Sequence, residues 1–271
     1  MIQKFKTIFQ ETHHYRYLIL QMTKREIVQR YRGSALGLVW SILNPLLMLI
    51  VYTFVFSVVF NARWSDTHEV GNRAEFAITL FSGLIVFNIF SEIVNKAPGL
   101  ILSNVNYVKK VIFPLEILPL VSIGSVLFHG LVGLVVLLTA ELLFYGFIPT
   151  TIFYFPLVLL PLVLMALGLS WFLSAFAVYI RDTVQIVPVV TTILLFVSAV
   201  FFPISSLPNR YQILVQLNPI ALIVSESRNV VVLGQPPNWL DLALMMLAGM
   251  TLSFAGYWWF QKVRKGFADV L

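Results

Sequence analysis

The chain has 271 residues, of which 59% are apolar and only 11% charged, and its formal net charge is +6. A soluble domain devotes about a quarter of its residues to charge, so the composition excludes an ordinary soluble protein and predicts a membrane domain. Because the sequence contains no cysteine, it excludes disulfides, thiolate metal sites and cysteine nucleophiles. The basic residues lie mostly at the chain ends and between apolar runs, a distribution typical of orientation signals and not of a nucleic-acid surface.

The first segment, residues 1–34, carries seven basic residues, and its apolar residues recur at mixed three- and four-residue spacings. This pattern predicts a cytoplasmic amphipathic helix on the membrane surface. The alternative is a basic tail that only sets orientation. No small-residue cleavage site follows an apolar run, so we do not expect a signal peptide. Residues 35–271 are expected to form a single transmembrane domain.

Six apolar runs follow, and nearly all are long enough to cross a hydrocarbon core of about 30 Å. We expect spanning helices at about 36–60, 75–94, 115–146, 152–179, 184–202 and 240–260. Long apolar runs favour helices over the short alternating strands of a barrel. Six spans put both termini on one side, and the basic residues of that side outnumber those of the other by fourteen to four. This bias predicts that both termini are cytoplasmic.

Charged residues inside the runs are the usual markers of function in lipid. Glu116 and Glu141 are expected near the ends of their span, in contact with headgroups or water, and Glu92 lies close to the cytoplasmic end of its own. His129 stands near the middle of a run, where we expect a hydrogen-bonded packing residue. The sequence contains neither a phosphate-binding GxxxxGK[ST] loop nor the HExxH or GxSxG motifs. We therefore predict no catalytic residue, no metal site and no cofactor bound by this chain.

The start of the first run carries several features at once. Arg30 and Arg32 precede it, Gly33 and Gly37 have the spacing of a close helix contact, and Asn44-Pro45 interrupts the helical ladder. The pattern RYRGSALGLVWSILNPL resembles the first span of ABC-2 type permeases that export polysaccharides such as O-antigen, group 2 capsule and teichoic acid. KKVIFP, the Arg181-Asp182 pair, Asn218-Pro219 and the tail GFADVL follow in the order that similar permeases show.

The resemblance implies an all-α fold with six transmembrane helices, an N-terminal interfacial helix and an outer re-entrant helical segment between spans five and six. It also implies a homodimer in the bacterial inner membrane, joined by two copies of an ATP-binding cassette subunit that holds ATP and magnesium. That subunit is expected to dock on the N-terminal amphipathic helix and on the loop between spans two and three, with Lys109, Lys110, Arg181 and Asp182 as the docking residues. The re-entrant segment falls at 203–238, where we expect Glu226 and Arg228 to form an outer gate.

The expected cargo is a lipid-linked polysaccharide, which requires an anion site and a path that passes hydroxyl groups. Arg30 and Arg32 are candidates to bind the lipid diphosphate at the entrance, although they also fit a role in orientation alone. Aromatic rings stack weakly on sugar faces, and the candidates for a channel lining are Tyr52, Phe56, Phe196, Phe201 and Phe202. The alternatives are a permease for drugs or small lipids and, from another class, a proton-coupled carrier or membrane-bound enzyme.

Overall fold

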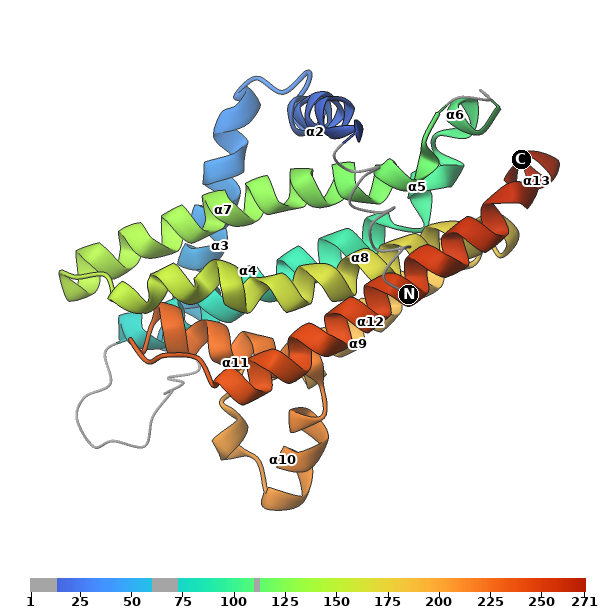
Figure 1. Cartoon of the computed structure of the whole chain (residues 1–271). Coiled ribbons are helices and arrows are strands. Elements are labelled where there is room, and N and C mark those ends of the chain that lie inside the picture. Colours follow the sequence, from blue (N-terminus) through green and yellow to red (C-terminus); the bar gives the residue numbers. More distant parts are fainter. Residues whose placement is uncertain (1–13, 60–72, 110–112) are drawn as a thin grey trace.

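The computed structural model describes residues 14–59, 73–109 and 113–271. The described residues form helices and connecting turns without any strand, which confirms the all-helical prediction (Figure 1). Lys110 and the first thirteen residues of the predicted N-terminal segment lie outside the described ranges.

Among the described residues, five helical stretches are long and apolar enough to cross a membrane. They are Gly37–Phe56, Glu75–Lys96, Leu115–Tyr145, Thr150–Tyr179 and Trp239–Val270. The remaining predicted span, 184–202, corresponds to the apolar helix α9 (Thr183–Val197), which has 15 residues. At 1.5 Å per residue this helix extends about 22 Å, less than the roughly 30 Å of a hydrocarbon core. The structure therefore supports five full spans and one shorter apolar helix.

The first predicted span is divided into three parts. A short 3-10 helix η1 (Gly37–Val39) leads into α3 (Trp40–Tyr52), and a π-helix η2 (Thr53–Val59) continues it. Gly33 and Gly37 have φ values of 87° and 52°, which favour glycine. A Cβ at either position would meet no atom within 4 Å, so the predicted helix contact through these glycines is wrong within this chain. Both glycines turn the backbone from the N-terminal helix into α3.

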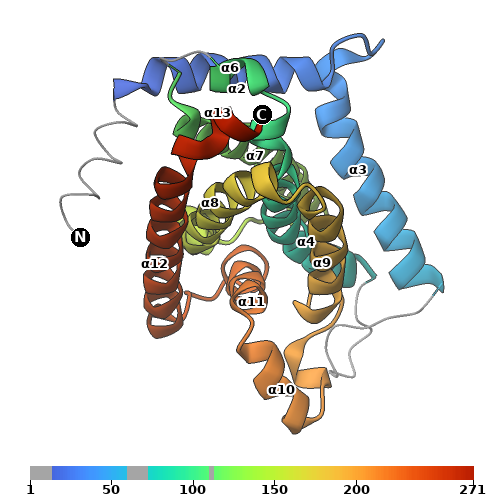
Figure 2. The same cartoon turned by 90° about the vertical axis from the view of Figure 1, so that its right-hand side faces the viewer.

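The N-terminal helix α2 (Arg16–Arg30) lies across the bundle, and α3 descends along the outside of the other helices (Figure 2). Helix α2 packs on α7 (Leu118–Tyr145), where Thr23 lies directly against Gly124. A side chain at Gly124 would place its Cβ 2.9 Å from Thr23, so the small residue permits this crossing. The predicted N-terminal segment therefore contains a helix from Arg16 onward.

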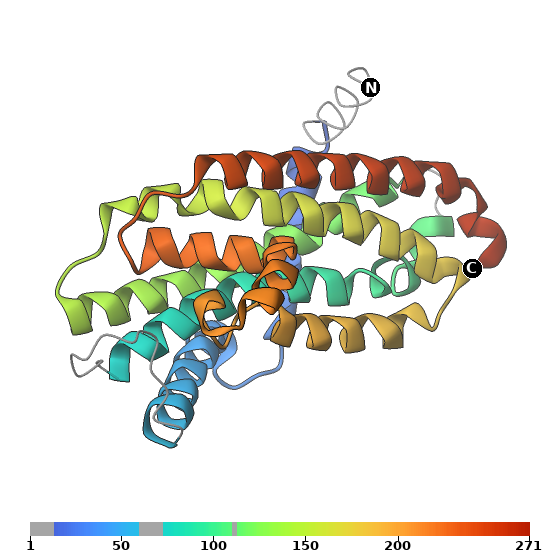
Figure 3. The same cartoon turned by 90° about the horizontal axis from the view of Figure 1, so that it is seen from below.

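Helix α4 (Arg73–Lys96) occupies the centre of the bundle, and nearly all of its residues from Phe76 to Val94 are buried. It contacts α7, α8 (Phe155–Tyr179), α9 and α11 (Pro219–Val231). Helix α8 also packs along α12 (Trp239–Val263), as Figure 3 shows. Gly168 and Gly256 face each other so closely that a Cβ at Gly256 would overlap the carbonyl of Gly168. Such small residues let transmembrane helices approach backbone to backbone.

Short elements connect the bundle helices. They are α5 (Gly99–Leu102), α6 (Val105–Lys109), η3 (Leu115–Ile117), η4 (Thr150–Tyr154), η5 (Ile204–Ser206), α10 (Asn209–Gln216), η6 (Arg264–Gly266) and α13 (Phe267–Val270). Helix α13 contacts α6, and Figure 1 shows both at one end of the bundle. Helix α11 folds back from α10 into the bundle, against α4 and α8.

Candidate functional site

A charged network joins the end of α2 to α4. Arg30 Nη1 lies 2.5 Å from Glu92 Oε1, and the same carboxylate oxygen lies 3.0 Å from Lys96 Nζ. Lys96 also pairs with Glu26 of α2 at 3.1 Å. All four side chains are partly exposed, with relative exposures between 26% and 42%. The predicted entrance arginine Arg30 is therefore already paired with a carboxylate and lies near a second cation that the sequence analysis missed.

Tyr31, the residue after Arg30, links the end of α2 to α7. Its hydroxyl lies 3.3 Å from His129 Nδ1, and the two rings meet edge to face. Partial burial is the main cause that raises the pKa of Tyr31 above its ordinary value, so the phenol stays protonated at neutral pH. His129 is thus hydrogen-bonded and packed, as expected from its position in an apolar run.

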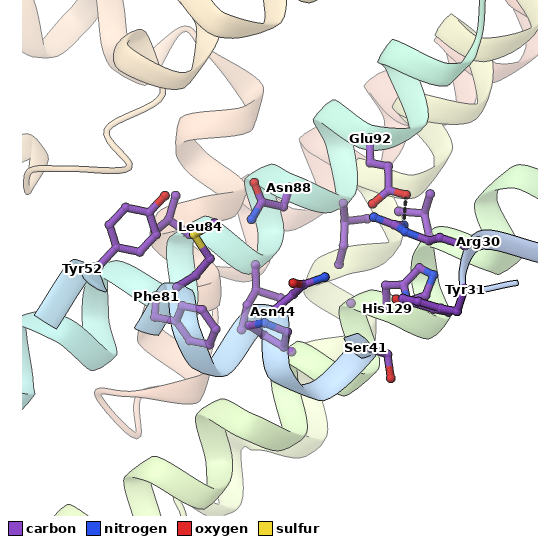
Figure 4. Close-up of a pocket in the computed structure, with 17 residues that line it drawn as sticks. Arg30, Tyr31, Ser41, Asn44, Tyr52, Phe81, Leu84, Asn88, Glu92 and His129 are labelled. Carbon is purple, nitrogen blue, oxygen red and sulfur yellow. Dashed lines mark hydrogen bonds and ion pairs between the residues drawn. The ribbon is translucent and has the colours of Figure 1, made fainter. Parts of the chain in front are cut away.

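A cavity of about 300 Å³ lies between α3, α4 and α7, below the end of α2. Its polar lining comes from Arg30 and Tyr31, from Ser41 and Asn44 on α3, from Asn88 and Glu92 on α4, and from His129 on α7 (Figure 4). Tyr52 and Phe81 form part of its apolar wall. A second, more open cavity of about 840 Å³ shares Arg30, Asn88 and Glu92 with the first and extends to Glu26 and Lys96.

Four of the five predicted lining aromatics form one continuous row that begins at this cavity. The ring centroids of Tyr52 and Phe56 are 6.4 Å apart, Phe56 stacks on Phe201 at 5.8 Å, and Phe201 lies 5.6 Å from Phe196. The row joins α3 and η2 to α9 and the turn that follows it. Phe202 does not belong to the row, because it packs on a separate small cluster with Ala199, Val215 and Ala221.

The two predicted arginines have different surroundings. Arg30 lines both cavities, whereas Arg32 lies exposed in the turn after α2 and lines neither of them. Within the described residues, the structure therefore brings Arg30 together with Lys96 and does not place Arg32 beside it.

The predicted outer-gate residues occupy α11. Arg228 is 5% exposed, and its guanidinium donates to the carbonyls of Thr79 at 3.1 Å, Ala199 at 2.9 Å and Val200 at 2.6 Å. Glu226 accepts from the backbone N–H of Asn238 at 3.0 Å. Each residue thus ties α11 to a different segment, Arg228 to α4 and the end of α9, and Glu226 to the start of α12.

The described residues of the predicted docking set are exposed at one end of the bundle. Lys109 ends α6, and Arg181 and Asp182 form the turn between α8 and α9. Glu116 lies nearby on η3, where Arg264 Nη1 binds Glu116 Oε2 at 2.6 Å. This ion pair and the fully buried Phe267 hold the C-terminal tail against the same end of the bundle.

The expected headgroup or water contact is wrong for Glu141. This residue is 2% exposed, and among the described residues neither of its carboxylate oxygens has a hydrogen-bond partner. The reason is that α7 continues to Tyr145 with α4 and α8 packed beside it, so the side chain faces protein and not the membrane surface.

Comparison with known proteins places this geometry in a family. The ABC-2 type transporter family matches residues 17–232. The chain is 28% identical over 265 residues to the O-antigen export system permease protein RfbA of Myxococcus xanthus, covering 97% of this chain and 98% of that protein. It is 24% identical to RfbA of Klebsiella pneumoniae, over 94% and 95% of the two chains. The polysialic acid transport protein KpsM of Escherichia coli is 24% identical, over 86% and 88%. The chain belongs to the ABC-2 type transporter family.

Proposed function

We propose that this chain is the membrane-spanning permease of an ATP-driven exporter that moves a polyprenyl-diphosphate-linked polysaccharide across the bacterial inner membrane. The observation that carries the proposal is that three features adjoin one another in space. These are the cations Arg30 and Lys96, the polar cavity beside them, and the aromatic row from Tyr52 to Phe196. The export functions named for the RfbA and KpsM relatives support the same cargo class.

In this proposal the lipid diphosphate binds at Arg30 and Lys96 by replacing Glu92. The Glu92 carboxylate bridges the two cations in the structure, at 2.5 Å and 3.0 Å. A phosphate offers the same negatively charged oxygens to both cations and carries additional acceptors. Because these side chains are partly exposed, the exchange requires no buried charge to be left without a partner. Glu92 then serves as an internal counter-ion that weakly binding anions do not displace.

Four variants test the site, with the stimulation of ATP hydrolysis by a polyprenyl diphosphate glycan as the readout. We expect Arg30→Ala and Lys96→Ala to raise the half-maximal glycan lipid concentration by about fivefold to tenfold each, the effect of losing one charge-assisted hydrogen bond at a partly exposed site. Glu92→Gln should lower it, because the competing carboxylate is removed.

Glu26→Gln is the matched control, since it removes a carboxylate partner of Lys96 and leaves the bridge between Arg30 and Lys96 in place. Its effect should be smaller than that of Glu92→Gln. Unchanged stimulation in both Arg30→Ala and Lys96→Ala would contradict the proposed site.

The proposed assembly is a homodimer with two ATP-binding subunits, both chain termini being cytoplasmic. The ATP-binding subunits hold ATP and magnesium and dock at the bundle end that carries α6, α13 and the turn between α8 and α9. Helix α11 and the segment from Pro203 onward then lie toward the outer face, where Glu226 and Arg228 belong to the gate.

A further inference from the structure

The most unusual polar residue of the bundle is Asn88. It lies in the otherwise buried middle of α4, yet its own side chain is exposed to the cavity between α3, α4 and α7. Asn44 of α3 is exposed to the same cavity from the other side (Figure 4). Among the described residues, neither side-chain amide has a hydrogen-bond partner. Two amides without partners inside spanning helices indicate a ligand or water in the space between them, because an unsatisfied polar group in a membrane is costly.

The lining of the cavity changes in character from one end to the other. Arg30 and Glu92 supply charge at the end below α2, the two amides follow, and Tyr52 begins the aromatic row at the far end. A side-chain amide offers both donors and an acceptor, which suits the neighbouring hydroxyl groups of a sugar. The ring of Tyr52 provides an apolar surface for a sugar's C–H face. Charge, amides and ring therefore occur in the order that a diphosphate and its attached sugar require.

The size of the cavity limits what it holds. Its volume of about 300 Å³ equals that of about ten water molecules in the liquid, at roughly 30 Å³ each. That space is sufficient for one sugar residue. The hydrogen bond between Tyr31 and His129 forms part of the cavity wall and occupies His129 Nδ1, whereas His129 Nε2 is buried without a partner among the described residues and remains able to bond to a ligand.

We propose that Asn44 and Asn88 form a subsite for the sugar residue attached directly to the lipid diphosphate. This inference rests on the proposed function, because it takes the diphosphate at Arg30 and Lys96 as its starting point. It adds a selectivity that the anion site alone lacks. The exporter recognises the lipid carrier by its diphosphate and recognises a loaded carrier by the first sugar.

The test compares two lipids on the permease assembled with its ATP-binding subunit in nanodiscs. One probe is undecaprenyl diphosphate, and the other is undecaprenyl diphosphate carrying a single N-acetylhexosamine. The wild-type protein should bind the sugar-bearing lipid about tenfold more tightly than the bare lipid, as expected for two neutral hydrogen bonds. In the double variant Asn44→Ala with Asn88→Ala, this ratio should fall toward one while the Kd for the bare lipid stays unchanged.

Two further variants separate recognition from folding. Asn44→Ser with Asn88→Ser keeps short hydrogen-bonding side chains and should recover part of the preference. Gln185→Ala removes an exposed amide at the start of α9, outside the cavity, and should leave the ratio at its wild-type value.

The possible outcomes are distinct. A ratio that stays at the wild-type value in the double alanine variant overturns the subsite and leaves the proposed function intact. Equal binding of the two lipids by the wild-type protein also overturns the subsite alone. Loss of binding of both lipids in the double alanine variant overturns the subsite too, because it would assign the amides to folding or to the diphosphate site. A wild-type complex that binds neither lipid overturns the proposed function together with the subsite.

Discussion

At the residue scale, Arg228 joins segments that lie far apart in the chain. Its guanidinium donates hydrogen bonds to the carbonyls of Thr79 on α4 and of Ala199 and Val200 just after α9. Ala199 has a φ of 51°, a conformation that is uncommon for any residue other than glycine. Gly83 makes room for the guanidinium, because a Cβ there would lie 2.5 Å from Arg228 Nη2. We infer that Arg228 stabilises the turn that ends α9.

Replacing this arginine with lysine tests the inference while keeping the charge. Lysine is a point donor and cannot reproduce a planar fork directed at three carbonyls. We expect Arg228→Lys to destabilise the purified permease by about 2 kcal/mol, the order of a lost charge-assisted hydrogen bond at a buried site. Thermal unfolding in detergent measures the change. Arg210→Lys on the exposed face of α10 is the control and should unfold at the wild-type temperature; equal midpoints for both variants would refute the role of Arg228.

At the element scale, the end of the bundle that carries α6 and α13 is the candidate contact for the ATP-binding subunit. Lys109 and Arg181 are both exposed there, on separate connections. We expect Lys109→Glu with Arg181→Glu to reduce the amount of ATP-binding subunit that co-purifies with the permease by at least about threefold, because rim charges of an interface act mainly through electrostatic complementarity. Arg210→Glu on the exposed face of α10, toward the proposed outer side, is the control and should keep the subunit. Unchanged co-purification with the bundle-end variant would contradict docking at this end.

The elements also show what the sequence can and cannot predict. Continuous apolar runs predicted four of the helices within a few residues, because hydropathy alone determines whether a segment stays in lipid. The break of the first span into three helical parts and the early end of α9 at Val197 depend on packing and on local backbone geometry, which hydropathy does not report.

The candidate site was predictable in part for the same reason. The aromatic row could be predicted from the sequence because Tyr52, Phe56, Phe196 and Phe201 lie near the ends of two apolar runs. The network in which Arg30 and Lys96 both pair with Glu92 brings Arg30 beside residues more than sixty positions away, and no single-sequence pattern encodes it. Asn88 could have been singled out as a lone amide in a long apolar run, which is a marker of a cavity in membrane proteins.

At the scale of the whole molecule, the cavity between α3, α4 and α7 and the aromatic row from Tyr52 to Phe196 lie between a compact bundle and the outer helix α3. The bundle is built on α4 and on the close packing of α8 with α12, while α3 lies outside it with most of its apolar side chains exposed (Figure 2). In the proposed homodimer a second copy or lipid covers this face, and the path for the glycan follows the row from Tyr52 to Phe196. In the proposed function the whole chain acts as a conduit, and an ATP-binding partner supplies the energy.

Transport in proteoliposomes tests this account most directly. The permease is reconstituted with its ATP-binding subunit facing outward, and a labelled polyprenyl-diphosphate polysaccharide is placed in the outer leaflet. With external ATP and magnesium, the glycan should become protected from an external glycosidase, and a proton gradient without ATP should produce no protection. Protection driven by the proton gradient alone, or no protection in the presence of ATP, would contradict the account.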